Sequence, residues 1–247
     1  MYKRLEYNKQ SFTTDVYSYI SPDAVEIINI NKSYEAEELD KYYPESSQLL
    51  NILKHIVHPP VIISKYPNEL YLLTTKAGIE QDEQIKQRIE KDIALPYPPL
   101  IKNYKDTEVF VYSLPNNKFL VCSFYKGLLI ISHNYKLVEN IIDADPEHSF
   151  FSDEDYKEIV DDALNKYPVG IFSKLQNDLL SMHYICRGDT IVMEGHLLSK
   201  VKNDSIATKN KLIHYMESIP NGTCIDSYDI YYENKWTMVK IILNKIY

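Results

Sequence analysis

The chain has 247 residues, 45% hydrophobic and 25% charged, a balance typical of folded globular proteins rather than disordered ones. Its formal net charge of −8, with lysine and arginine scattered rather than clustered, argues against a nucleic-acid partner. The cysteines, Cys122, Cys186 and Cys224, form no CxxC pair. They predict neither a disulfide framework nor a zinc site, and we expect them to be buried.

No apolar run reaches the roughly 20 residues that a membrane helix needs. The N-terminal MYKRLEYNKQSFTTD has basic residues but no hydrophobic segment behind them. We therefore expect no membrane span and no signal peptide in this sequence, so membrane attachment would need an N-terminal anchor that it lacks. The 22 tyrosines suit strands with one wet face, and they also suit contact surfaces for proteins or glycans.

The first elements in chain order are a strand, a helix and a short hairpin. VEIINI, after Pro22, predicts a strand, and Pro44 begins a predicted core helix that ends before Pro59-Pro60. VIISK and ELYLLTTK flank Tyr66-Pro67-Asn68 and predict a hairpin.

A different helix is predicted from Gln81 to Asp92. Only Ile85, Ile89 and Ile93 are apolar in this charged segment, a narrow stripe that would seat on a surface. The stripe packs either on its own protein or on a partner, and these isoleucines are our candidate interface residues.

The central segment predicts a three-stranded meander. VFVYSL and KFLVCSF flank Pro115-Asn116-Asn117, and Tyr125-Lys126-Gly127 then turns the chain into LLIIS. The following acidic stretch places carboxylates at Asp143 and Asp145 with an approximate calcium-loop spacing, but His148 stands where that loop needs glycine. We expect a solvated connection instead, leading to a helix capped by Ser152 and ending near Tyr167.

The C-terminal part predicts two long hairpins with a helix between them. LLSMHYICR and TIVMEGHLLSK flank Gly188-Asp189, and CIDSYDIYY and KWTMVKIILNKIY flank Glu233-Asn234. Residues 204–218 predict the helix. In the last arm Thr237, Val239, Ile241 and Leu243 occupy alternate positions, which predicts a continuous apolar face. The fold class is therefore α+β, built on antiparallel hairpins and meanders with packed helices.

A faint internal repeat predicts two related halves. SYISPDA leads into the strand VEIINI, and SIPNG leads into TCIDSYDIYY, so each places an apolar residue and a proline just ahead of a strand. The predicted seam near Asp145-Pro146 gives α+β halves at 1–145 and 146–247. The alternative is one continuous unit.

No pattern names a reaction. The chain has no GxSxG, P-loop or GxGxxG motif, and 6 glycines offer little material for a phosphate-binding loop, so we predict no catalytic residue and no cofactor. His55 and His58 lie three apart at a predicted helix end and are the weak candidates for a metal site. Without a third ligand, the simpler interpretation is that they interact with the helix dipole.

Three segments resemble a known family: SYISPDAVEIINI, FLVCSFYKGLLIISHNYKLVENIIDAD, and IFSKLQNDLL through to HLLSK. It is a family of uncharacterised cell-envelope proteins of Bacteroidota, described only as a domain of unknown function. Ile20, Pro22, Asp23 and Ala24 match its entry to the first strand, with Ser21 inserted. Residues 128–132 with Leu137, Val138 and Glu139 match its later motif. The resemblance implies an envelope location, on the periplasmic side, and transfers no catalytic residue.

These observations predict a non-enzymatic binding or scaffolding protein of a bacterial cell envelope, with a protein or glycan as its ligand. One alternative is a hydrolase whose site assembles only in the fold. The other is a cytoplasmic interaction protein that uses the helix of Ile85, Ile89 and Ile93.

Overall fold

A computed structural model describes residues 14–31, 50, 56–152, 164, 167–176, 178–198, 205–217, 223–233 and 236–245. The chain divides into two compact units: an N-terminal unit of Met1–Val25 with Gln48–Glu154, and a C-terminal unit of Glu26–Ser47 with Asp155–Tyr247. The division falls at 154/155 rather than at the predicted 145/146, and it groups the first strand with the C-terminal unit. Among the described residues, no helix is both long and apolar enough to cross a membrane.

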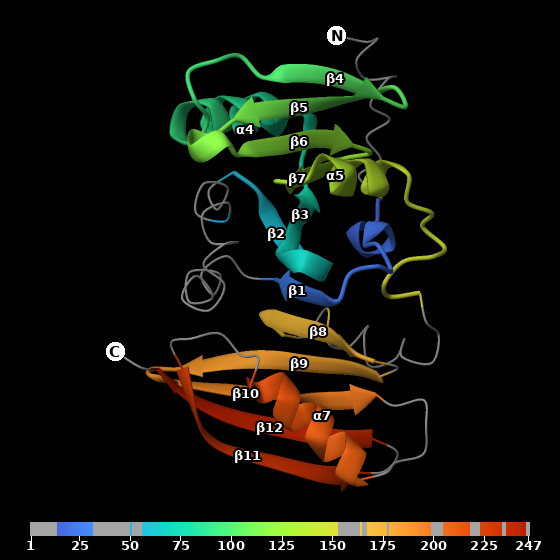
Figure 1. The fold of residues 1–247 in the computed structure, drawn as a ribbon, viewed down its shortest axis with the longest axis vertical. Helices are drawn as coiled ribbons and strands as arrows, with labels where there is room; N and C mark the ends of the chain where they lie inside the picture. The colour runs from blue at the N-terminus through green and yellow to red at the C-terminus, as the bar shows by residue number, and fades with distance from the viewer. Residues whose placement is uncertain are drawn as a thin grey trace. The chain divides into compact units, whose positions relative to one another are not determined.

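The N-terminal unit is built on an antiparallel sheet with the order β2-β3-β7-β6-β5-β4 (Figure 1). Strand β4 is outermost. The strands are β2 (His58–Tyr66), β3 (Leu70–Lys76), β4 (Leu100–Tyr104), β5 (Thr107–Ser113), β6 (Phe119–Tyr125) and β7 (Leu128–Ser132). The predicted hairpin and meander are confirmed by the pairing of β2 with β3 and of β5 with β6 and β7.

Turn chemistry explains these reversals. Asn68 and Asn116 have φ of 63° and 60°, the left-handed backbone that asparagine tolerates better than most residues. Between β6 and β7, Lys126 and Gly127 both have positive φ, as a tight turn between right-twisted strands requires.

Two helices cover opposite faces of this sheet: α4 (Ile79–Asp92) and α5 (Tyr135–Ile142). The ammonium of Lys86 in α4 lies 4.4 Å from the centroid of the Phe110 ring. On the α5 side, Lys102 lies over Tyr135 and pairs in the sheet with Val109, the neighbour of Phe110. Because successive strand residues point to opposite faces, the two helices flank the sheet.

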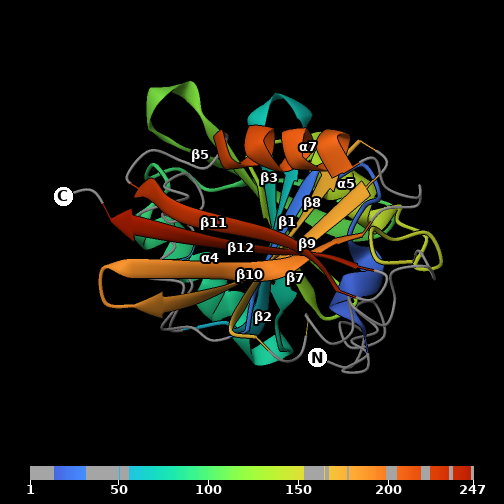
Figure 2. The same ribbon diagram turned by 90° about the horizontal axis from the view of Figure 1, so that it is seen from below.

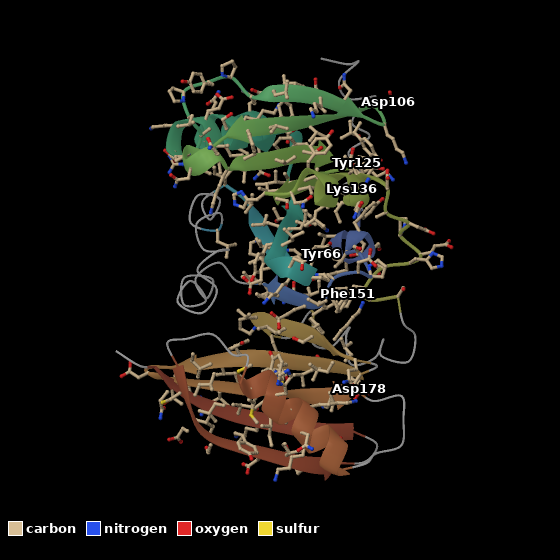
Figure 3. All side chains as sticks on the ribbon, in the orientation of Figure 1. Tyr66, Asp106, Tyr125, Lys136, Phe151 and Asp178 are labelled. Carbon is tan, nitrogen blue, oxygen red and sulfur yellow. The ribbon has the colours of Figure 1, made fainter. Side chains whose placement is uncertain are left out.

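At the end of β2, burial raises the pKa of Tyr66 to about 12 (Figure 3).

The C-terminal unit has the strand order β11-β12-β10-β9-β8-β1, again antiparallel throughout. Strand β11 is outermost. The elements are β1 (Glu26–Ile30), β8 (Val169–Leu175), β9 (Asp178–Arg187), β10 (Thr190–Leu198), α7 (Ser205–Glu217), β11 (Thr223–Glu233) and β12 (Trp236–Lys245). Both long hairpins and the helix between them are confirmed.

Helix α7 covers one face of this second sheet (Figure 2). Leu212, Tyr215 and Met216 are its buried residues, and the face beneath includes Met193 and Ile241, which pair with each other. Lys211 extends from α7 to Asp178 at the start of β9, with 2.7 Å between Nζ and Oδ2 (Asp178 is labelled in Figure 3). The apolar alternation predicted in the last arm is confirmed, since Thr237, Val239, Ile241 and Leu243 are all buried.

Two predicted helices fall largely outside the described residues. Of the helix that follows Pro44, only Leu50 is described as helical, and of the helix after Ser152, only Leu164 is. Leu164 is buried, and its carbonyl accepts hydrogen bonds from the side-chain amides of Asn29 and Asn31.

Candidate functional site

The outermost strands carry most of the exposed large apolar side chains in the described part of the chain. Leu100 and Ile101 lie on β4, and Ile225, Tyr228 and Tyr231 lie on β11; their exposed fractions run from 40% to 58%. The other such residues are Val25, Tyr97 and Phe119. An outermost strand also presents backbone N–H and C=O groups that have no partner strand on one side. Among the described residues, the two edges therefore combine exposed apolar area with backbone groups that no neighbouring strand pairs on one side.

Strand β11 is the longer of the two edges. It spans 11 residues and pairs with β12 along its length. Asp226 and Asp229 are exposed, and a register shift between Ile225 and Ser227 marks a bulge, a common protective device on edge strands. Asn244 donates a hydrogen bond from Nδ2 to Oδ1 of Asp226 over 3.2 Å, which anchors the bulge to β12.

A row of charged side chains runs from β11 across β12, β10 and β9, on the face of the sheet opposite α7. In cross-strand register, Asp229 pairs with Lys240, Lys240 with Glu194, and Glu194 with His183. The Lys240 Nζ lies 2.8 Å from Glu194 Oε1, and His183 Nε2 lies 3.9 Å from Glu194 Oε2. The pKa of Glu194 is lowered, mainly by the hydrogen bond from Lys240. The Tyr167 ring stacks on His183 with centroids 3.5 Å apart.

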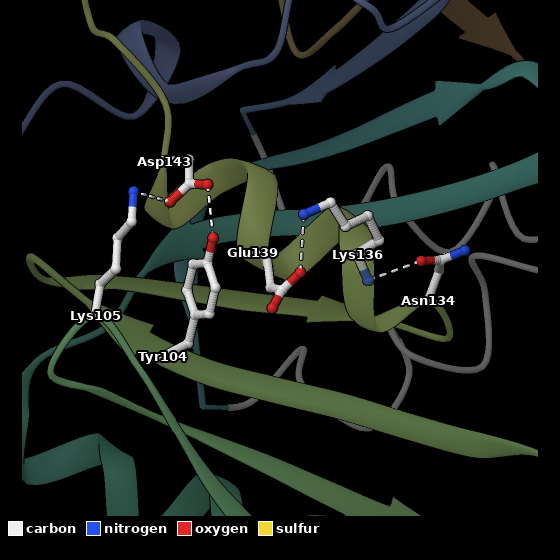
Figure 4. A network of polar contacts seen from close by, with 6 residues as sticks. All are labelled: Tyr104, Lys105, Asn134, Lys136, Glu139 and Asp143. Atoms are coloured by element: carbon white, nitrogen blue, oxygen red, sulfur yellow. Dashed lines mark hydrogen bonds and ion pairs between the residues drawn. The ribbon is translucent and has the colours of Figure 1, made fainter.

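Strand β4 is shorter and has the opposite charge. Leu100, Ile101, Lys102 and Asn103 are all exposed, so both faces of the strand meet solvent. Its C-terminal end is fixed to α5 at Asp143 (Figure 4).

Two side chains make that attachment at Asp143. The Tyr104 hydroxyl donates to Oδ2 over 2.7 Å, and Lys105 Nζ lies 2.8 Å from Oδ1. Lys105 and then Tyr104 lower the pKa of the Asp143 carboxyl. On α5 itself, the side chain of Asn134 accepts from the Lys136 backbone as the N-cap, and Lys136 pairs with Glu139 over 3.0 Å (Figure 4). Sequence reasoning considered Asp143 only as a loop carboxylate, whereas it ends α5 and holds the edge strand.

His58 does not lie on a helix end as predicted. His58 is the first residue of β2 and pairs with Lys76, while His55 lies outside the described residues. The strand begins earlier than expected because Pro59 and Pro60 fit within a register shift between His58 and Val61, where ladder hydrogen bonds are not required. The described residues contain no group of three or more His, Cys, Asp or Glu able to hold a metal ion.

The isoleucine stripe is packed inside its own unit. Helix α4 forms as predicted, but Ile85 and Ile89 are 0% exposed, and Ile93 at the helix end is half-buried. The helix seats on the sheet face that carries Phe110, so its apolar side is used there and is not available to a partner. We therefore replace the interface prediction for these residues by the packing alternative.

Cys122 and Cys224 differ in exposure, and the side chain of Cys186 lies outside the described part of the structure. Cys122 is fully buried, as predicted, and burial raises the pKa of its thiol, which makes it unreactive. Cys224 is exposed on β11, so the prediction of a buried residue is wrong there. An outermost strand has a neighbour on one side alone, and a small side chain near its end is consequently left in solvent.

The edge strands and the charged row were not identified from the sequence. One signal was available: CIDSYDIYY mixes acidic and large apolar residues without the strict alternation of its partner arm. That irregularity is typical of a strand that is covered on neither face. Which strands lie at the edges depends on the order of the strands in the sheet, and the local sequence does not indicate that order.

The comparisons with known proteins give a fold relationship. No family model matches the chain, and no curated protein does. Three solved structures of TP0453 are similar: crystal form III at 10% identity and a TM-score of 0.52, form I at 7% and 0.53, and form IV at 8% and 0.51. The alignments cover 95%, 95% and 94% of this chain and 96%, 94% and 94% of the respective TP0453 chains. At this identity the likeness concerns the α+β fold alone.

Proposed function

We propose that the chain is a non-enzymatic binding protein that receives an extended polypeptide segment along β11. The observation that supports this proposal is an outermost strand of 11 residues that exposes Ile225, Tyr228 and Tyr231. Another strand can add to an outermost strand, and a partner segment that did so would cover these apolar side chains.

The charge of β11 indicates the chemistry of the partner segment. Asp226, Asp229 and Glu233 are acidic and the strand has no basic residue. Lys240, beside Asp229 in register, already pairs with Glu194 on its other side. A segment that alternates lysine or arginine with apolar residues would therefore complement both the charges and the exposed side chains.

A protein ligand fits this edge better than a glycan. Tyrosine rings stack on sugars as well as on side chains, but free backbone groups in strand geometry are matched by another strand. A glycan remains an outcome of the test.

The test is a titration of a fluorescently labelled peptide, in which lysine and isoleucine alternate, with the full chain. Fluorescence anisotropy of the peptide measures binding. Tyr231→Lys should weaken binding by about tenfold or more, because it removes an aromatic contact and places a cation against a cationic segment. The matched control is Phe119→Lys, an equally exposed aromatic on β6. Equal loss in both variants, or binding of a glycan array in place of the peptide, would overturn the proposal.

We also propose the location in a bacterial envelope, which rests on the resemblance of residues 18–30, 119–145 and 171–200 to the envelope family. Fractionation of the native cells with an antibody to the chain tests it, and recovery in the cytoplasmic fraction would refute it.

Neither alternative function gains support from the described residues. No observation among them favours a hydrolase, and the cytoplasmic interaction protein depended on Ile85 and Ile89, which are buried.

We further infer that the two units are related halves. In each unit the second strand of a hairpin is followed by a helix. The strand that comes after the helix is outermost in the sheet. The last strand of the unit pairs with the hairpin strand that precedes the helix. In the N-terminal unit these elements are β3, α4, β4 and β7; in the C-terminal unit they are β10, α7, β11 and β12. An alignment of homologues that placed no matching positions in the two units would contradict this inference.

A further inference from the structure

We propose that the segment received by β11 is strand β4 of a second copy of this chain, so that the protein assembles head to tail. This inference rests on the proposed function of β11 and names its partner. Both strands are outermost in their units, and both expose large apolar side chains. What distinguishes them is the sign of their charge.

The charges favour pairing of unlike edges. Lys102 is the charged residue of strand β4, whereas β11 carries the exposed Asp226 and Asp229. Two β11 strands aligned at Asp226 and Asp229 would oppose carboxylates, and two β4 strands aligned at Lys102 would oppose lysines. Like charges directly opposite one another destabilise a strand pair, so self-pairing of either edge is disfavoured.

One antiparallel register places the charged and apolar residues of β4 against complementary residues of β11. With Lys102 of one copy opposite Asp229 of the next, Leu100 lies opposite Tyr231, and both pairs point to the same face because strand periodicity is two residues. On the other face Ile101 then lies opposite Ile230. Every exposed apolar residue of β4 meets an apolar or aromatic residue of β11 in this register.

Such a contact is heterologous, because it joins different surfaces of the two copies. Each added copy offers its own β11 to the next, so assembly continues until a ring closes or a filament forms.

The test uses charge exchange in the full chain. Sedimentation velocity over a range of concentrations at low salt should show association of the unaltered protein. Lys102→Asp and Asp229→Lys should each weaken it by about tenfold or more, because each places like charges opposite one another. An equal mixture of these two variants should recover association, since the copies then alternate with complementary edges. Lys118→Asp, at an exposed lysine that belongs to neither strand, is the control for net charge.

The outcomes separate this inference from the proposed function. If both single variants associate as strongly as the unaltered protein, or if their mixture does not associate more strongly than either alone, β4 is not the partner of β11. A chain that stays monomeric while its β11 still binds the lysine-isoleucine peptide overturns the β4 partner but not the proposed function. A chain that neither associates nor binds the peptide overturns both.

Discussion

Gly195→Ala should destabilise the C-terminal unit strongly, because β10 passes too close to β9 for any side chain at this position. A Cβ built on Gly195 lies 1.9 Å from the carbonyl oxygen of Ser181 and 2.7 Å from the Cα of Met182. Ordinary contact begins near 3.4 Å, so the neighbouring strand would have to retreat by roughly 1.5 Å. Both obstacles are backbone atoms, and no rotamer change relieves them. Overpacking together with weakened ladder hydrogen bonds gives an expected loss of about 3 kcal/mol.

Urea unfolding followed by tryptophan fluorescence measures this loss, since the single tryptophan, Trp236, lies in β12 of the same unit. The control is Gly188→Ala in the turn of the same hairpin. Gly188 has φ of +63° but no atom within 4 Å of a built Cβ, so its cost is conformational and about 1 kcal/mol. A Gly195→Ala protein within about 0.5 kcal/mol of the unaltered one would refute the close approach of the strands.

Other predictions concern contacts around the two sheets. Lys211→Met removes the partner that lies 2.7 Å from the buried carboxylate of Asp178, and it should lower the free energy of unfolding by about 2 kcal/mol in urea titration. No change would mean that the contact contributes nothing. Lys240→Gln removes the main cause of the lowered pKa of Glu194. A carboxyl group whose pKa is lowered by folding stabilises the protein at pH values above its pKa in the unfolded chain. This stabilisation is lost as the pH falls through the pKa of the folded protein. The variant should therefore be less stable than the unaltered protein near neutral pH. The difference should shrink below the ordinary glutamate pKa of 4.5; a difference that grows in acid would contradict this. The exposed thiol of Cys224 should react rapidly with a thiol reagent in the native protein, and persistence of the fast phase in Cys224→Ser would contradict its placement.

The sequence by itself determined the local elements. Asn116 and Gly188 have the positive φ that tight reversals need, and the alternation from Thr237 to Leu243 identifies the buried face of β12. These features depend on residues close together in the chain, so periodicity and turn chemistry reveal them. The stripe of Ile85, Ile89 and Ile93 in a charged segment likewise predicted the helix α4 correctly.

Only the tertiary structure decided which strands lie beside which. Strand β1 pairs with β8, its register joining Glu26 to Ser173, and β12 lies between β10 and β11. Such pairings join segments distant in sequence through backbone groups that are the same in nearly every residue, so side-chain patterns carry little information about them. They nevertheless determine that Ile85 is core, that Cys224 is exposed, and that β4 and β11 each pair with a single strand among the described residues.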